Sequence, residues 1–435
     1  MVAIRIGRLT ASRARLAGIA VLAIGLPLAA SGQAELSLED ALREARAANA
    51  RLPLSSLDLS AARERVGQAQ AERWLRVALE GNFLYAPASG YDPVLTNLGE
   101  ARGQIVARQP LYAGGALRAG VARADAQVAV AGARYRIAVR DLDLEVRSRY
   151  AQLLSARAEA AARQEGIERL TSYRTSLQSR QAAGQGVAAD VLKTEVRLAL
   201  EEAAVADAEQ RADEARLALN QSLGRDPSGT LAVATLLPPA APAAGDAAPW
   251  ERAPEIEAAE AEARSAEAQL TIARAERLPH VSLNADTGFW VSDTTHLNGD
   301  FWDRFWGAKG YSLSLTVAWP LWDRGGLRAR IAEADLGLRS AQTKLEVERR
   351  DARLAWAQAR SAQEHLFRQI EILSRAAPDA RDSYLQIESR YRGGAASALE
   401  VLDAYAAAVD AQVRLNEVIA RYRIAQALAL RWSEP

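Results

Sequence analysis

The 435-residue sequence contains no cysteine, and its single methionine is Met1. Without cysteine the chain forms no disulfide, offers no thiolate to a metal ion and has no site for the N-terminal acylation of lipoproteins. The absence therefore excludes a disulfide scaffold and a lipidated membrane protein.

Aromatic residues are also scarce, at 6% of the chain, and much of the 49% hydrophobic content is alanine, so a thick core is not expected. Lysine occurs only three times, at Lys193, Lys309 and Lys344. The 54 basic residues are balanced by 54 acidic ones. This balance gives no surface for binding polyanions, so we expect no nucleic acid partner.

Groups that catalyse reactions or bind metals are few and scattered. The three histidines, His280, His296 and His365, fall in a predicted strand, a loop and a long helix, and suggest neither a metal cluster nor a catalytic triad. The Gly-Gly pairs in AGGALR and RGGLR lack the Lys-Ser/Thr end of a phosphate-binding loop. We expect no enzyme activity, no cofactor and no metal site.

Long apolar runs are missing except at the N-terminus, where several arginines precede an apolar run over residues 16–30. We interpret residues 1–34 as a signal peptide cleaved near Ala34. An N-terminal anchor is the alternative, although the run is shorter than the ~20 residues that a spanning helix needs. Any membrane attachment of the mature chain is then expected to come from β-strands.

The rest of the sequence is a tandem duplication. AERWLRVAL (71–79) recurs as AERLPHVSL (275–283), PLYAGGALRA (110–119) as PLWDRGGLRA (320–329), and SRQAAGQGVAADVL (179–192) as SRYRGGAASALEVL (389–402). The first match has an offset of 204 residues and the other two have 210. We predict a first repeat over 35–224, a connector at the waist over 225–253 and a second repeat over 254–432. The Pro and Gly clusters of the connector also fit a flexible linker.

Each repeat is predicted to contain a long helix flanked by two shorter ones. Ala116–Ala183, rich in Ala, Arg, Glu and Leu, would be ~100 Å long at 1.5 Å per residue. The shorter helices of the repeat, Leu36–Arg73 and Val187–Leu223, stacked end to end would match it. The second repeat is expected to follow with Ala253–Arg277, Leu327–Tyr391 and Ser397–Trp432. Taken alone, such helices also fit an antiparallel coiled-coil scaffold.

Two segments of the second repeat alternate between apolar and polar residues, HVSLNADTGFWV from His280 and YSLSLTVAWPLW from Tyr311. The first repeat has weaker counterparts around Val77–Tyr85 and Gln104–Arg108. Strands of ~10 residues with one apolar face fit a membrane-spanning β-barrel, although a soluble sheet gives the same pattern. Four strands do not close a barrel, and an open edge is not tolerated in hydrocarbon. Three copies, with twelve strands, are the smallest assembly with a lumen.

Several motifs together resemble the TolC-type outer membrane factors over nearly the whole mature chain. They are LSLEDALREARAANA near the N-terminus, the AERxxxVxL entry to each strand pair, the PLY/PLW and Gly-Gly exit, and the paired R-x3-G-x5-[DE]-V-L segments. The resemblance implies a homotrimer in the outer membrane of a Gram-negative bacterium. Its twelve-stranded barrel, surrounded by outer membrane lipid, would continue into a twelve-helix periplasmic tunnel. Trp74-Leu75 departs from the Leu-Pro that the second repeat has at Leu278-Pro279.

The resemblance also implies a passive export duct that serves efflux or type I secretion. It would dock onto a periplasmic adaptor (membrane fusion) protein and an inner-membrane RND or ABC pump. The alternative is a periplasmic coiled-coil structural or adaptor protein without a channel. Two helical hairpins and membrane-type strands favour the duct.

Two sets of residues follow as candidate functional positions. A glycine allows the turn between two helices, and an acidic residue suits the first turn of the returning helix; the resemblance adds a role at the entrance and in adaptor docking. These tip residues are Arg180, Gly184, Asp190, Leu192, Arg390, Gly394, Glu400 and Leu402. The expected barrel-to-tunnel joints contain Pro110, Gly114, Gly115, Pro320, Gly325 and Gly326. In the loop after residue 292, Phe301, Trp302, Phe305 and Trp306 fit an interfacial girdle or extracellular loop better than a ligand-stacking site.

Overall fold

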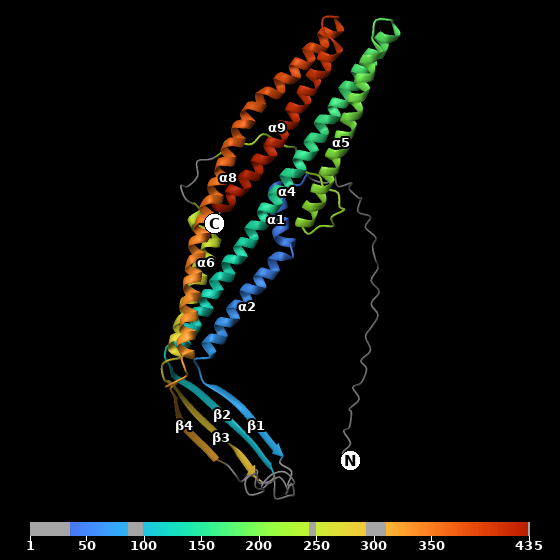
Figure 1. The fold of residues 1–435 in the computed structure, drawn as a ribbon. Helices are drawn as coiled ribbons and strands as arrows, with labels where there is room; N and C mark the ends of the chain where they lie inside the picture. Colours follow the sequence, from blue (N-terminus) through green and yellow to red (C-terminus); the bar gives the residue numbers. More distant parts are fainter. Residues whose placement is uncertain (1–34, 86–98, 243–248, 293–309, 434–435) are drawn as a thin grey trace, which may run out of the picture.

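The computed structural model describes residues 35–85, 99–242, 249–292 and 310–433. The predicted signal peptide and the aromatic residues 301–306 lie outside these ranges. The described chain is a long helical rod with a sheet at one end and two helix tips at the other (Figure 1).

The first repeat contains α1 (Leu38–Ala48), α2 (Arg51–Ala71), α4 (Ala116–Ala182) and α5 (Ala188–Ser222). Helices α1, α2 and α5 all pack along α4. This confirms the prediction that two shorter helical segments, one before the strands and one after the tip, together run the length of the long helix. The prediction of a single helix over Leu36–Arg73 is wrong. Asn49 interrupts it, because its Oδ1 accepts a hydrogen bond from Arg51 N (2.9 Å) and its Nδ2 donates to Ser222 O (3.3 Å).

The second repeat contains α6 (Pro254–Ala275), α8 (Gly326–Arg392) and α9 (Ala398–Ser433), and a short helix, η1 (Pro249–Arg252), precedes it at the end of the predicted connector. Helices α6 and α9 pack along α8, and both also contact α4. The long helices of the two repeats have the same length, 67 residues each. The predicted helices of this repeat are confirmed to within a few residues at their ends.

One antiparallel sheet contains β1 (Arg76–Tyr85), β2 (Gly99–Ala113), β3 (His280–Ser292) and β4 (Gly310–Ala318), in that order. The register between β2 and β3 shifts between Pro110 and Tyr112. Proline lacks a backbone N–H, and such an irregularity is one of the few places where a strand accepts it. The four predicted strands are therefore present, and β1 and β4 are the edges of the sheet.

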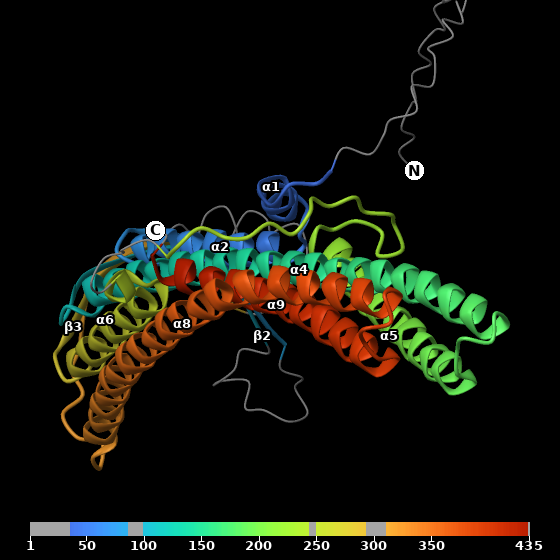
Figure 2. The ribbon, with the colours of Figure 1, turned by 90° about the horizontal axis from the view of Figure 1, so that it is seen from above.

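The hydrophobic core is thin and divided along the rod. One cluster joins α1, α4 and α5 near the waist, and another joins α4, α5, α8 and α9 below the tips. Viewed from the end, the helices form a curved wall rather than a globule (Figure 2). Alanine at many of the buried positions allows the helices to approach closely in such a wall.

The connector packs against the waist over its described residues. Leu36 N donates to Ala232 O (2.8 Å), and Leu231 is buried in the waist cluster. Arg157 of α4 donates to Leu231 O and Arg423 of α9 to Leu237 O, each at 2.7 Å. The connector thus contacts both repeats, while the limits given above for repeats and connector remain predictions.

The two strand pairs are attached to their helices by equivalent hydrogen bonds. Gln109 Nε2 of β2 donates to Arg73 O at 3.1 Å, and the Trp319 indole N–H donates to Arg277 O at 3.2 Å. Gln109 and Trp319 are 210 positions apart, and Arg73 and Arg277 are 204 apart. The two repeats of the sequence therefore make the same hydrogen bond at equivalent positions.

Candidate functional site: sheet faces, joints and helix tips

One face of the sheet is apolar and exposed. The strand register places Leu283 of β3 opposite Leu315 of β4, and Val281 opposite Val317. Leu79 of β1 continues this face, opposite Ile105 of β2. The large side chains that project from it in the described chain include Val77, Leu79, Phe83, Ile105, Tyr311, Leu313, Leu315 and Val317. An exposed apolar surface of this extent marks a membrane or protein contact.

The opposite face is polar and internally hydrogen-bonded. Arg108 Nη2 contacts Glu80 Oε1 at 3.1 Å, and Gln104 Nε2 donates to Glu80 Oε2 at 3.3 Å. Asn284 Nδ2 donates to Thr316 Oγ1 at 2.9 Å. The sheet therefore separates a lipid-compatible face from a water-compatible one.

The first joint between sheet and helix turns on two glycines. Gly114 and Gly115 adopt φ values of 60° and 92°, a region that a residue with a Cβ enters only at a cost. A Cβ on Gly114 would also lie 2.9 Å from Ala275 O and 3.0 Å from the Leu278 side chain. Pro110 lies three residues inside the end of β2, next to the shift in register.

The second joint differs in its details. Its positive φ values belong to Arg324 (57°) and Gly325 (93°), whereas Gly326 is the first residue of α8. Asp323 Oδ1 accepts a hydrogen bond from Gly325 N at 3.0 Å, and its other carboxylate oxygen accepts one from Leu327 N. A carboxylate at a helix N-terminus is favourable. Pro320 lies beyond the end of β4, so the two prolines are not at equivalent places in their strands.

At each tip, the long helix that comes from the sheet, α4 or α8, ends in a Schellman turn. In the first, Gly184 adopts φ 73°, Gln185 N donates to Arg180 O (2.8 Å) and Gly184 N donates to Gln181 O (3.0 Å). The second tip repeats the turn with Gly394 at φ 77°. A Cβ on either of these two glycines would meet nothing within 4 Å, so the backbone angle alone requires glycine.

The helices that follow the two turns, α5 and α9, begin differently. Ser397 and Glu400 form a capping box, in which Ser397 N donates to Glu400 Oε2 (2.6 Å) and Glu400 N donates to Ser397 Oγ (3.3 Å). The hydrogen bond from the Ser397 backbone lowers the pKa of the Glu400 carboxyl, with help from the Ser397 side chain. Val187 stands at the equivalent position before Asp190 and makes no side-chain cap.

The equivalent arginines at the tips also differ. Arg180 of the first hairpin (α4 and α5) reaches across to the second hairpin (α8 and α9). It donates hydrogen bonds to Tyr391 O (3.3 Å) and Arg392 O (2.5 Å), and its guanidinium lies over the Tyr391 ring. Arg390 donates to Ala395 O (3.2 Å) within its own turn. A cation at the end of α8 is favourable because the helix carbonyls converge there. Arg180 therefore ties the two tips together.

The two predicted tip leucines have different surroundings. Leu192 on α5 is 61% exposed, whereas Leu402 on α9 packs against the cluster below the tips. The difference follows from position in the wall, because α9 lies between α4 and α8 while α5 contacts mainly α4.

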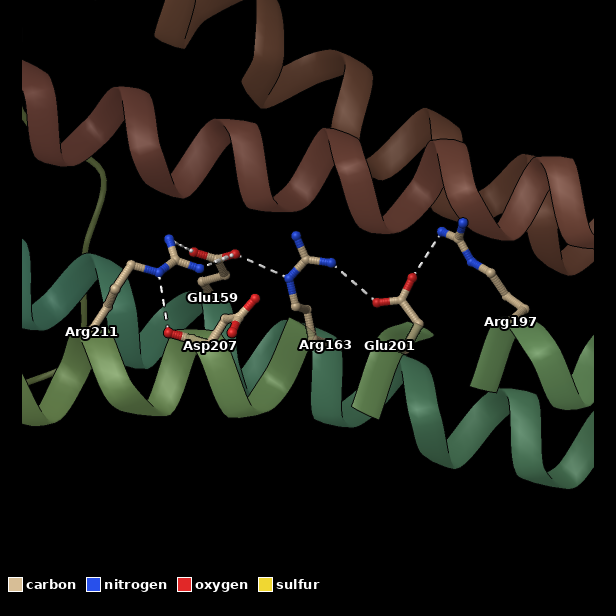
Figure 3. A network of polar contacts seen from close by, with 6 residues as sticks. All are labelled: Glu159, Arg163, Arg197, Glu201, Asp207 and Arg211. Atoms are coloured by element: carbon tan, nitrogen blue, oxygen red, sulfur yellow. Dashed lines mark hydrogen bonds and ion pairs between the residues drawn. The ribbon is translucent and has the colours of Figure 1, made fainter. Parts of the chain in front are cut away.

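A buried ion-pair network below the first tip was not foreseen from the sequence (Figure 3). Glu201 of α5, whose side chain is 3% exposed, contacts Arg163 of α4 at 3.1 Å and Arg197 at 2.8 Å. Glu159 contacts Arg163 at 3.0 Å and Arg211 at 2.9 Å. Two of these pairs, Glu159 with Arg163 and Arg197 with Glu201, are four residues apart on one helix, which is the spacing by which they could have been found in the sequence.

Tyrosines fill the space between the two hairpins beside this network. The rings of Tyr384 and Tyr405 meet edge to face at 6.0 Å, and the Tyr405 hydroxyl points at Gly166 of α4. Burial raises the pKa of Tyr384 to about 12 and also raises the pKa of Tyr173 and Tyr405. Aromatic packing therefore joins the two hairpins, with Gly166 making room for the Tyr405 ring, whereas the ion pairs join α4 to α5 within the first hairpin.

No cluster of three or more His, Asp or Glu side chains suited to a metal ion occurs among the described residues. Within the same residues, no helix is both long enough and apolar enough to cross a bilayer.

Residues 32–225 and 250–430 match the profile of a known family, described as outer membrane efflux protein. The chain belongs to the outer membrane efflux protein family. The predicted resemblance and the predicted outer-membrane location are thereby confirmed. The family match favours a channel over a periplasmic scaffold or adaptor protein.

Solved structures of several outer-membrane proteins and channels have the same fold. The outer-membrane channel OprN is 23% identical, with a TM-score of 0.80 over 91% of this chain and 89% of that one. VceC of Vibrio cholerae is 20% identical (TM-score 0.78; 91% and 96%), and CusC is 18% identical (TM-score 0.81; 92% and 92%). No curated protein sequence matches the chain significantly. The predicted fold class, long helical hairpins in tandem with four strands per chain, is confirmed.

Proposed function

We propose that three copies of this chain form a passive export duct through the outer membrane. The observation that carries the proposal is the four-stranded sheet, which exposes a continuous apolar face and has two unpaired edges, β1 and β4. In hydrocarbon those edges need partners. Three copies joined edge to edge supply twelve strands, which is enough for a barrel with an open lumen.

The polar face of each sheet would line this lumen, and the curved helical wall would continue it into the periplasm (Figure 2). The duct does no chemistry in this account. Its contribution is a water-filled path whose helical end opens when partner proteins bind.

The partners we propose are a periplasmic adaptor protein and an inner-membrane RND or ABC pump, which meet the duct at its tips. Three features support the tips as the contact region. Each tip is a glycine turn at the far end from the sheet, Leu192 is exposed beside the first turn, and Arg180 already links the two hairpins. Arg180 and Arg390 are proposed as docking or gate residues, with Asp190 and Glu400 shaping the turns.

Cell fractionation followed by a count of subunits tests the duct. The expected result is an outer-membrane protein that, extracted in detergent, has the mass of three mature chains by light scattering. A periplasmic monomer would contradict the proposal.

Charge reversal tests the tips separately. Arg180→Glu together with Arg390→Glu is expected to abolish export and crosslinking to the adaptor while leaving the trimer assembled. The matched control is Arg264→Glu, an exposed arginine far from the tips on α6, which lies between α4 and α8 and not at an edge of the wall. Normal export and crosslinking in the Arg180/Arg390 variant would show that the tip arginines do not dock.

A further inference from the structure

Four short segments meet where the sheet joins the helical wall (Figure 1). Besides the two equivalent hydrogen bonds described above, Arg330 contacts Glu276 at 2.9 Å, and Gly114 packs against Ala275 and Leu278. The two repeats therefore build one unit at this level of the rod. We call it the joint region, and it consists of residues 71–76, 109–119, 272–280 and 319–330.

The joint region is strongly basic, although the chain as a whole has no net charge. It contains eight arginines and only three carboxylates, so its net charge is +5. Each carboxylate already has a partner: Glu72 contacts Arg76 at 3.8 Å, Glu276 contacts Arg330, and Asp323 accepts hydrogen bonds at the start of α8. The other six arginines are exposed and form no ion pair within the described residues. They are Arg73, Arg118, Arg274, Arg277, Arg324 and Arg328.

Large apolar side chains are exposed in the same region. Trp319 continues the apolar face of the sheet two residues beyond Val317 of β4. Tryptophan and tyrosine concentrate where the hydrocarbon of a bilayer meets its headgroups, and arginine lays its apolar stem along such a surface while its guanidinium stays in water. The joint region thus has the composition of a membrane interface. Its exposed apolar side chains are Trp74, Leu75, Leu111, Tyr112, Leu278, Trp319, Leu321 and Trp322.

Arg324 gives the clearest sign that one of these arginines has a role of its own. Its φ is 57°, and at the repeat offset of 210 its counterpart in the first joint is Gly114, whose φ is 60°. A residue with a Cβ adopts this conformation only at a cost, which the first repeat avoids. The Arg324 guanidinium lies over the Trp322 ring, 5.8 Å from its centroid. An exposed cation kept at a strained turn points to a function for the side chain.

We propose that the joint region binds anionic phospholipids of the bilayer leaflet that faces the periplasm. The apolar face of the sheet contacts the acyl chains, and the unpaired arginines contact the phosphates, with Arg324 and Trp322 forming one headgroup site.

Two observations favour this occupant. Guanidinium groups suit phosphate in charge and geometry, and the joint region directly continues the exposed apolar face of the sheet. In the proposed trimer the region recurs in each copy and forms a basic collar. The inference rests on the proposed function and identifies the lipid that surrounds the duct at its periplasmic rim.

Thermal melting of the purified trimer with added lipid tests the proposal, because a ligand that binds the folded state stabilises it. Phosphatidylglycerol in the detergent solution is expected to raise the melting temperature several degrees more than phosphatidylcholine, which has no net charge. Inorganic phosphate at the same concentration is expected to have no effect, because it lacks acyl chains. If inorganic phosphate acted as strongly as phosphatidylglycerol, the partner would be a free anion and the proposal would be wrong.

Arg324→Gly separates lipid binding from folding. Glycine is the residue of the first joint, so without lipid the variant is expected to melt no lower than the parent protein. The difference between the two lipids is expected to shrink in this variant, and to shrink further when Arg73→Gln and Arg277→Gln are added. The matched control is Arg414→Ala, an exposed arginine of α9 without an ion pair in the described chain. This control is expected to keep the full difference.

The outcomes distinguish this inference from the proposed function. A trimer that assembles in the outer membrane but responds equally to the two lipids would overturn the inference alone. The same conclusion would follow if the combined arginine variant kept the full difference between the lipids. A chain that does not assemble in the outer membrane would overturn the proposed function instead.

Discussion

At the scale of single residues, the two tip turns depend on one backbone angle each. Gly184 and Gly394 have positive φ and free space around the position of a Cβ. Alanine at either position is expected to destabilise the folded chain by about 1–2 kcal/mol, the cost of a left-handed conformation for a residue with a Cβ. Denaturant titration followed by helical circular dichroism measures the change.

Gly67→Ala is the matched control for these two substitutions. Gly67 lies inside α2, has no positive φ and also has nothing within 4 Å of a Cβ. Alanine there is expected to stabilise by up to about 1 kcal/mol, because it is the better helix former. If Gly184→Ala and Gly394→Ala behaved like Gly67→Ala, the assignment of the turns would be wrong.

The buried tyrosines predict a loss of stability at alkaline pH. Burial raises the pKa of Tyr384 to about 12, whereas tyrosine in the unfolded chain ionises near 10. A raised folded pKa gives a contribution that is complete below pH 10 and is lost as the pH rises toward 12. Tyr384→Phe is expected to flatten this decline by up to about 1.4 kcal/mol per pH unit. The free energy of unfolding is measured by denaturant titration at pH 9–12. If it fell with pH as steeply in Tyr384→Phe as in the parent protein, the burial of Tyr384 would not be the cause of the decline.

At the scale of elements, the ion-pair network joins α4 to α5. Glu201→Ala would leave Arg163 and Arg197 without the buried carboxylate that both contact. The expected cost is about 3–5 kcal/mol, typical of an ion pair broken from one side in a buried place. Thermal melting of Glu201→Ala and of Glu202→Ala, an exposed neighbour on the same helix, compares the two. Equal melting temperatures would show that the network does not stabilise the hairpin.

The order and lengths of most elements could be predicted from the sequence because the hydrophobic spacing, the glycines and the duplication all agree. The break at Asn49 was missed, since it depends on hydrogen bonds to Arg51 and to a distant carbonyl, Ser222 O. No spacing within one helix reveals such a partner.

The residue pairs matched by the duplication were predicted as equivalents, and the structure separates them. Arg180 and Arg390 occupy matching turns, yet only Arg180 reaches the other hairpin. Leu192 and Leu402 differ in burial because α5 lies at an edge of the wall and α9 does not. The place of a helix in the wall depends on how the whole chain folds, so it cannot be predicted from a local sequence motif.

At the scale of the whole molecule, the single chain consists of a sheet and a helical wall. Each of these has two open edges. The sheet ends in β1 and β4, and the helical wall ends in α8 on one side and in α2 and α5 on the other. Exposed apolar side chains occur on both the sheet and the edge helices. An assembly that joins each edge to the opposite edge of the next copy removes all of these at once.

The barrel itself gives the most direct test of the central claim, that three copies form one channel. Within the chain, Ile105 of β2 pairs with Thr287 of β3, and the repeat offsets translate this pair into Leu315 of β4 and Phe83 of β1 in the next copy. We would measure disulfide crosslinking of the Leu315→Cys, Phe83→Cys protein in outer membranes. The account predicts a ladder of products that stops at three chains. The absence of intermolecular products, or a ladder that continues beyond three chains, would contradict it.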